Sequence, residues 1–141
     1  MLYLDASVLV ALLTQDALSD QADALMQRQS ARLVVSDFAA VEFASAVARR
    51  VRIGALPEQD ARSAFGAFDA WTARLAERVD LATSDIVSAG AMLRRLDTPL
   101  RSGEALNIAI ADRLGAVLAT FDRKMAKAAR ALGVEVAETA G

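Results

Sequence analysis

The chain has 141 residues with neither cysteine nor histidine, and its 16 basic and 18 acidic side chains leave a net charge of −2. This length suits one ordinary domain, so we expect a single domain over residues 1–141. The charge balance excludes a surface that attracts nucleic acid everywhere, although a local basic patch remains compatible with it. No apolar run approaches the roughly 20 residues that cross a bilayer, and the N-terminus lacks a basic signal region. We therefore expect no membrane contact and a cytoplasmic location.

Short apolar segments alternate with longer helical patterns along the chain. We expect strands at residues 2–4, 33–35, 116–120 and 134–136, and a short strand or extended connector at 78–81. We expect residues 7–13 to form the start of a helix and further helices to cover 38–52, 86–96, 104–114 and 124–132. Another helix is expected to begin at residues 57–58. Apolar side chains at helical spacing give the helix that begins at 57–58 a core-facing stripe: Ala61, Ala64, Phe65, Phe68, Trp71 and Leu75. Strands separated by helices indicate an α/β fold whose sheet is mostly parallel and covered on both faces.

Four acidic residues lie where such a fold places its chemistry. Asp5 and Asp122 follow expected strands, and Glu42 and Glu104 lie near the beginnings of apolar helices. Ligands of parallel sheets bind outside the carboxyl ends of the strands, so four acids from distant segments can meet there. We call these four residues the acidic site.

Each acid also has a purely structural interpretation. Asp5 and Asp122 are good N-caps for the helices that follow them. Glu104 can be a favourable negative charge in a helix's first turn, and Glu42 can share an exposed polar face with Arg49. These interpretations stay open for each residue alone, but four together are harder to explain in this way.

The absence of histidine and cysteine restricts any metal site to oxygen ligands, which suit Mg²⁺ or Mn²⁺ rather than zinc. Two carboxylates about 4 Å apart repel by about 4 kcal/mol at an effective dielectric near 20, so a shared site must take up protons or a cation. Phosphate chemistry assisted by a hard cation is the function that this predicts.

The motifs around the acids, taken together, resemble the PIN-domain nucleases of the VapC type, the toxin half of bacterial toxin–antitoxin pairs. The opening strand ends in Asp5, a small residue and Ser7, and a second short strand precedes a helix with a central Glu42. Glu104 lies in an LR-x-x-[DE]-A-L segment, and Asp122 ends a T-x-D motif before an Ala-rich helix and LGV. The similarity covers essentially the whole chain.

This resemblance implies a PIN-like three-layer α/β/α fold with a short, mostly parallel central sheet. It implies that Asp5, Glu42, Glu104 and Asp122 hold Mg²⁺ or Mn²⁺ and catalyse endonucleolytic hydrolysis of RNA by an activated water. Ser7, Thr120 and Asn107 match positions that support the acids. The resemblance also implies a homodimer and a cognate antitoxin partner.

The clustered cations add a further expectation. Most basic residues suit solvated helix faces, but Arg123 and Lys124 adjoin Asp122, and with Arg49 they are candidate RNA contacts. Two residues depart from the family pattern: Glu104 stands where aspartate is usual, and Asn107 where many relatives carry histidine.

Three other classes of function are alternatives. A phosphohydrolase with Asp5 as its nucleophile would need a second aspartate two residues later, where this chain has Ser7. A nucleotide-binding fold would need a glycine-rich turn after the first strand, which is absent. A catalytically silent PIN-like domain used for binding or oligomerisation would retain the acids as caps.

Overall fold

The computed structural model describes residues 1–139, which form a parallel sheet between two layers of helices. The strands are β1 (Leu2–Leu4), β2 (Leu33–Ser36), β3 (Ala76–Val79) and β4 (Val117–Ala119). The helices are α1 (Ala6–Leu13), α2 (Ser19–Arg28), α3 (Asp37–Arg52), α4 (Glu58–Leu75), α5 (Thr83–Arg94), α6 (Ser102–Leu114) and α7 (Arg123–Ala131). None of these helices combines the length and apolar character that crossing a bilayer requires.

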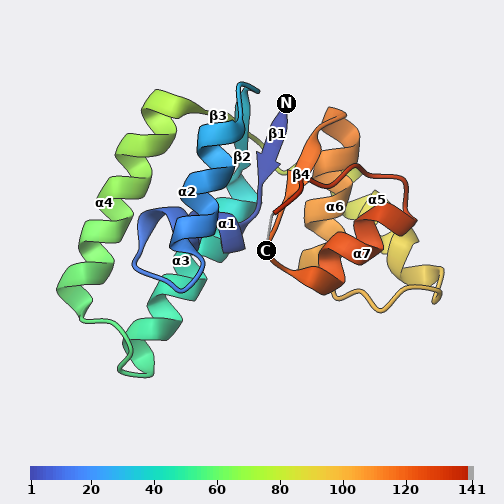
Figure 1. The fold of residues 1–141 in the computed structure, drawn as a ribbon. Coiled ribbons are helices and arrows are strands. Elements are labelled where there is room, and N and C mark those ends of the chain that lie inside the picture. Colours follow the sequence, from blue (N-terminus) through green and yellow to red (C-terminus); the bar gives the residue numbers. More distant parts are fainter. Residues whose placement is uncertain (140–141) are drawn as a thin grey trace.

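The sheet is parallel throughout, with the strand order β3-β2-β1-β4. Helices α1 to α4 lie on one side of it and α5 to α7 on the other, which gives the expected α/β/α arrangement (Figure 1). Strand β1 pairs with two neighbours: Leu2 is in register with Leu33 of β2 and with Val117 of β4. The N-terminal strand is therefore a central strand, and its residues Leu2, Tyr3 and Leu4 are buried in the core.

Local sequence signals set the ends of several helices. The Ser36 hydroxyl accepts a hydrogen bond from the Ala39 amide at 2.9 Å, so Ser36 is the N-cap of α3. Gly115 ends α6 in the left-handed conformation, with φ of 61°, which glycine adopts without strain. Helix α5 ends two residues before the expected position 96, since Leu96 has φ of 60° and cannot continue the helix.

Three expectations for the fold need correction. Helix α2 forms in a segment for which the sequence predicted no element; Ala22 and Leu25 are its only fully buried residues, a weak periodic signal. The strand expected at 78–81 is β3, which begins directly after α4, as the backbone turns extended at Ala76. The strand expected at 134–136 is reduced to one bridge, between Leu118 and Val136.

The apolar stripe of α4 packs largely as expected. Ala61, Ala64 and Phe68 are buried, and the Phe68 ring stacks on Phe43 of α3 with centroids 4.7 Å apart. Leu75 is the exception because it remains 56% exposed at the end of the helix. The contact between α3 and α4 matters for the site, since α3 carries Glu42.

Candidate functional site

Asp5 lies at the carboxyl end of β1 and is only 3% exposed. Its Oδ1 atom accepts hydrogen bonds from the Ser7 hydroxyl at 2.6 Å and from the Val8 amide at 3.1 Å. Its Oδ2 atom accepts a hydrogen bond from the Thr120 hydroxyl of the β4 end. Burial raises the pKa of Asp5, while the Ser7 and Thr120 hydroxyls partly counteract that rise. Asp5 is thus an N-cap of α1 whose second oxygen faces a different strand end.

Two hydroxyls join the ends of β1 and β4 around Asp5. The Ser7 hydroxyl oxygen accepts a hydrogen bond from the Phe121 amide at 2.9 Å and lies 3.5 Å from Thr120 Oγ1. Because Ser7 and Thr120 each donate to Asp5, the carboxylate is fixed from two segments far apart in sequence. The structure therefore places Ser7 and Thr120, which the resemblance to PIN-domain nucleases implied as supporting residues, against the Asp5 carboxylate.

Asp122 lies just beyond this hydroxyl pair. Its backbone amide donates to Thr120 Oγ1 at 3.0 Å, and its Oδ1 atom accepts from the Met125 amide at 3.0 Å. The side chain is the N-cap of α7, so the structural interpretation of Asp122 is realised. A single residue, Thr120, links this acid to Asp5.

Glu42 is half-buried on α3, and Asn107 of α6 holds it. The Asn107 Nδ2 atom donates to Glu42 Oε1 at 2.7 Å and to the Gly103 carbonyl at 3.0 Å. Burial raises the pKa of Glu42, Asn107 lowers it, and the negative charges of Asp5 and Glu104 raise it further. These charge effects mean that Glu42 shares one electrostatic environment with two other acids of the site.

A buried hydroxyl beneath Glu42 was not anticipated from the sequence. Tyr3, which is 0% exposed in β1, donates from its hydroxyl to Asn107 Oδ1 at 2.7 Å and lies 2.7 Å from Ser36 Oγ. The single tyrosine proton goes to the amide oxygen, so Ser36 is the donor in the second bond. Hydrogen bonds therefore run from Ser36 to Tyr3, from Tyr3 to Asn107 and from Asn107 to Glu42. This chain of bonds fixes the Asn107 amide so that its NH₂ group faces the Glu42 carboxylate. A tyrosine in an otherwise aliphatic buried strand was the available signal, since its hydroxyl needs a partner.

Gly103 lets the start of α6 approach Glu42 closely. A Cβ atom built on Gly103 would lie 3.0 Å from Glu42 Oε2. Glycine thus leaves room for the Glu42 carboxylate at this point. The glycine one residue before Glu104 has a packing reason that the motif alone did not reveal.

Glu104 affects Glu42 electrostatically, but its carboxylate is engaged at the start of its own helix. Its Oε2 atom accepts a hydrogen bond from the Arg101 amide at 2.7 Å at the start of α6, as the structural interpretation expects. Its charge nevertheless contributes to the raised pKa of Glu42. Glu104, the candidate third ligand, is therefore near the site, but its carboxylate caps the start of α6.

The acidic site fits a hard cation in donor chemistry and in charge. All its donors are oxygens, and the raised pKa values of Asp5 and Glu42 reflect burial that a bound cation would offset. As they stand, however, no three acidic side chains in residues 1–139 are arranged to hold a metal ion. Glu104 would have to leave its cap at Arg101 to complete such a set.

The expected RNA contacts are exposed cations on two helices. Arg49 lies in the last turn of α3, and Arg123 and Lys124 form the start of α7 next to Asp122. The two residues of α7 are thus beside the acidic site in sequence and in space.

The sequence matches the PIN domain family over residues 2–131. The chain belongs to the PIN-domain family. No curated protein sequence matches it. The toxin VapC20 of Mycobacterium tuberculosis, described as cleaving the sarcin-ricin loop, has a TM-score of 0.75 at 19% identity, with 91% of this chain and 95% of that chain covered.

Two further solved structures share the fold. FitAcB from Neisseria gonorrhoeae has a TM-score of 0.72 at 14% identity, covering 99% of this chain and 98% of that chain. VapBC-1 from nontypeable Haemophilus influenzae has a TM-score of 0.68 at 18% identity, with the same coverage of 99% and 98%. The resemblance to PIN domains of VapC toxins is confirmed, and at these identities the solved structures establish a common fold.

Proposed function

We propose that this PIN-domain protein is a metal-dependent endoribonuclease and the toxin of a bacterial toxin–antitoxin pair. One observation carries the proposal: Asp5 and Glu42, which are 37 residues apart in the sequence, share one electrostatic environment at the carboxyl edge of the sheet. The charge of Glu104 contributes to the same environment. Membership of the PIN-domain family and the fold shared with VapC20 support this function.

In the proposed mechanism, Asp5, Glu42, Glu104 and Asp122 would hold the ion. Mg²⁺ or Mn²⁺ supplies a Lewis acid that acidifies water and neutralises charge on the scissile phosphate. Asn107 orients Glu42 through its 2.7 Å hydrogen bond, and Ser7 and Thr120 orient Asp5. These supporting groups fix two carboxylates before substrate arrives, which reduces the reorganisation needed in the transition state.

A phosphohydrolase that uses Asp5 as a nucleophile is a poorer fit. Both carboxylate oxygens of Asp5 accept hydrogen bonds from neighbouring donors, and the side chain is 3% exposed. A nucleophile needs an accessible oxygen aimed at phosphorus. A metal ligand whose carboxylate is held by hydrogen bonds needs only one free lone pair directed at the ion.

The proposal includes protein partners and a cytoplasmic setting. We expect a homodimer and a cognate antitoxin; a toxin–antitoxin complex from Klebsiella pneumoniae is among the solved structures that share the fold. Large apolar side chains remain exposed in the single chain, among them Val41 at 66%, Val87 at 67% and Leu96 at 90%. Burying such side chains against a partner is favourable by roughly 25 cal/mol per Å².

The decisive experiment compares wild-type protein with Asp5→Asn on a mixed pool of structured RNAs, with Mg²⁺, with Mn²⁺ and with EDTA. Cleavage that requires both a divalent ion and Asp5 is the expected result. Asp5→Asn should fold normally, because an amide can retain hydrogen bonds at this buried position. Absence of cleavage by the wild type, together with absence of calorimetric metal binding, would leave the silent binding domain as the function.

A further inference from the structure

Helix α7 presents an unbalanced positive face next to the acidic site. It contains four basic residues and no acidic one, in a chain whose net charge is −2. All four are exposed: Arg123, Lys124, Lys127 and Arg130. Arg123, Lys127 and Arg130 are spaced four and three residues apart, so they form one stripe along the helix. We call these three residues the α7 stripe.

Helix stability does not account for the start of this stripe. Cations in the first turn of a helix oppose its macrodipole, and Arg123 and Lys124 occupy that turn in α7. The first turn of α7 holds no acidic residue, and the Asp122 cap before it supplies a favourable negative charge. At the other end, Arg130 comes no closer than 3.9 Å to Glu138, and both side chains are exposed, so this ion pair is weak. The stripe is therefore available to an anionic ligand.

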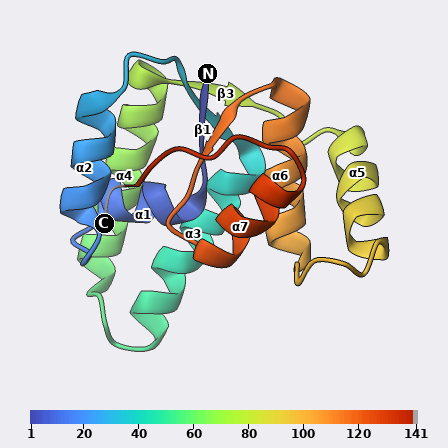
Figure 2. The ribbon, with the colours of Figure 1, turned by 45° about the vertical axis from the view of Figure 1, so that its right-hand side comes forward.

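A cavity of about 240 Å³ lies along the same helix and opens beside the acidic site. Its lining combines a phenyl ring, an amide and two guanidinium groups, from Gln21, Phe121, Arg123 and Arg130, and reaches Thr120 and Asp122. The Phe121 backbone is fixed because its amide donates to Ser7 Oγ, the hydroxyl that also contacts Asp5. Figure 2 shows α7 in front of α6, with the C-terminal segment running past it.

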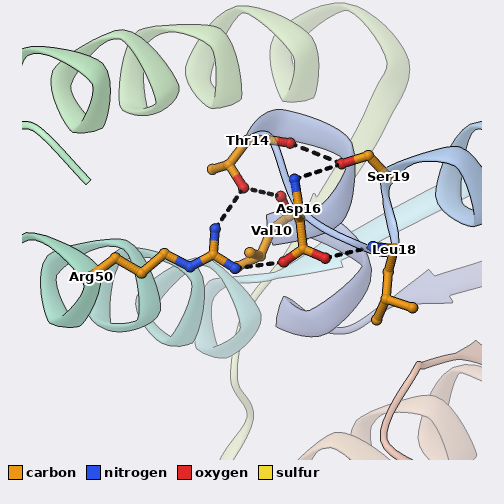
Figure 3. Close-up of polar contacts among 6 residues, drawn as sticks. All are labelled: Val10, Thr14, Asp16, Leu18, Ser19 and Arg50. Atoms are coloured by element: carbon orange, nitrogen blue, oxygen red, sulfur yellow. Dashed lines mark hydrogen bonds and ion pairs between the residues drawn. The ribbon is translucent and has the colours of Figure 1, made fainter. Parts of the chain in front are cut away.

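The far wall of the cavity, at Leu18 and the start of α2, is held by a compact polar cluster (Figure 3). Arg50 of α3 forms an ion pair with Asp16 and donates to Thr14 Oγ1 at 3.1 Å. Asp16 Oδ1 in turn accepts a hydrogen bond from the Leu18 amide at 2.7 Å. The turn before α2 is thus fixed from α3, and the cavity has a rigid wall opposite α7.

We propose that the α7 stripe and this cavity bind the RNA strand next to the scissile phosphate. The α7 stripe contacts successive phosphates, and one unpaired base stacks on Phe121 inside the cavity. The features that support single-stranded RNA are the charge of the stripe, the aromatic wall and the direct continuation of the cavity into the acidic site at Thr120 and Asp122. This inference rests on the proposed nuclease function and names where its substrate lies.

The test measures binding without cleavage. The affinity of a short fluorescent single-stranded RNA is measured by anisotropy in EDTA at several salt concentrations, for the wild type and for a Lys127→Gln/Arg130→Gln double variant. Each lost phosphate contact should reduce the slope of log K against log salt by about 0.7, so the double variant should lose about 1.4. The matched control is Arg94→Gln, an exposed arginine in the last turn of α5, which should keep the wild-type slope.

Phe121→Leu tests the stacked base separately. It should weaken binding about fivefold, the low end of a lost base–aromatic contact, and leave the salt slope unchanged because no charge is removed. Its thermal melting temperature is recorded first, since Phe121 packs partly against the core. If the melting temperature falls, Gln21→Ala replaces it, since Gln21 is a partly exposed residue of α2 on the same cavity, and binding should again weaken.

The outcomes separate this inference from the nuclease proposal. Equal slopes for the double variant and the Arg94→Gln control would overturn the inference even if the wild type cleaves RNA. A reduced slope with no metal-dependent cleavage would support the binding surface and refute the nuclease. Absence of RNA binding by the wild type at low salt would overturn the inference outright.

Discussion

Removing one oxygen atom by Tyr3→Phe tests whether the buried hydrogen-bond chain holds the site. The Tyr3 hydroxyl is 0% exposed and makes two hydrogen bonds of 2.7 Å, to Ser36 and Asn107. Its loss leaves the Asn107 oxygen without a donor, which costs about 1 to 3 kcal/mol. The Ser36 hydroxyl can rotate toward another acceptor, so its share is smaller. We expect the free energy of unfolding to fall by about 2 kcal/mol.

The same change should weaken metal binding. Without Tyr3, the Asn107 amide is no longer fixed with its NH₂ group toward Glu42, and groups that orient metal ligands are worth about 10- to 100-fold in affinity. Urea denaturation gives the stability, and isothermal calorimetry with Mn²⁺ gives the affinity. Thr72→Val is the control, because it removes a buried hydroxyl that donates to the Phe68 carbonyl within α4, a helix that carries none of the four acids. A Tyr3→Phe variant with wild-type metal affinity would refute the role of the chain of bonds in positioning Glu42.

Three further changes test other parts of the site. Gly103→Ala should keep or slightly raise stability, since alanine favours helix by about 1 kcal/mol, yet lower Mn²⁺ affinity by displacing Glu42; calorimetry showing unchanged affinity would contradict this. Glu104→Asp should retain RNA cleavage within about tenfold, and a folded, metal-binding but inactive variant would show that the longer side chain is required. Burial raises the pKa of Asp16, but the Leu18 amide and Arg50 bring that pKa below its ordinary 3.8. The ionised carboxylate therefore stabilises the folded protein fully above that pH, and this stabilisation is lost as the pH falls through the folded pKa. Asp16→Asn should therefore cost about 1 to 2 kcal/mol at pH 7 and less near pH 3, as urea titrations at both values would measure.

The sheet and most helices could be predicted because their signals are local. Apolar runs such as residues 2–4 and N-caps such as Ser36 act within a few residues, and the structure places strand β1 and helix α3 there. Helix α2 could not be predicted from periodicity, since only Ala22 and Leu25 are fully buried and the rest of its surface is polar or partly exposed. The strand expected at 134–136 does not form, because Val136 pairs with Leu118 in a single bridge and the pairing does not continue into a ladder.

The candidate site was predictable in its residue types but not in its geometry. The expected strand ends pointed to Asp5 and Asp122, because parallel strands end at a common edge of the sheet. The sequence allowed Glu104 either a favourable place in the first turn of a helix or a role as a ligand, and only the structure shows its hydrogen bond with the Arg101 amide. The same holds for Tyr3, whose hydroxyl meets Asn107 only after residues 104 positions apart are brought together.

The central position of β1 also determines when the site can form during synthesis. Asp5 is synthesised well before Thr120, whose hydroxyl contacts the second oxygen of its carboxylate from 115 residues later in the chain. Contacts of such separation form late in folding because a long loop must close first. A nascent chain, or any product truncated before β4, therefore has Asp5 without the hydroxyl that orients it, and the proposed cleavage of RNA should require that β4 has been synthesised.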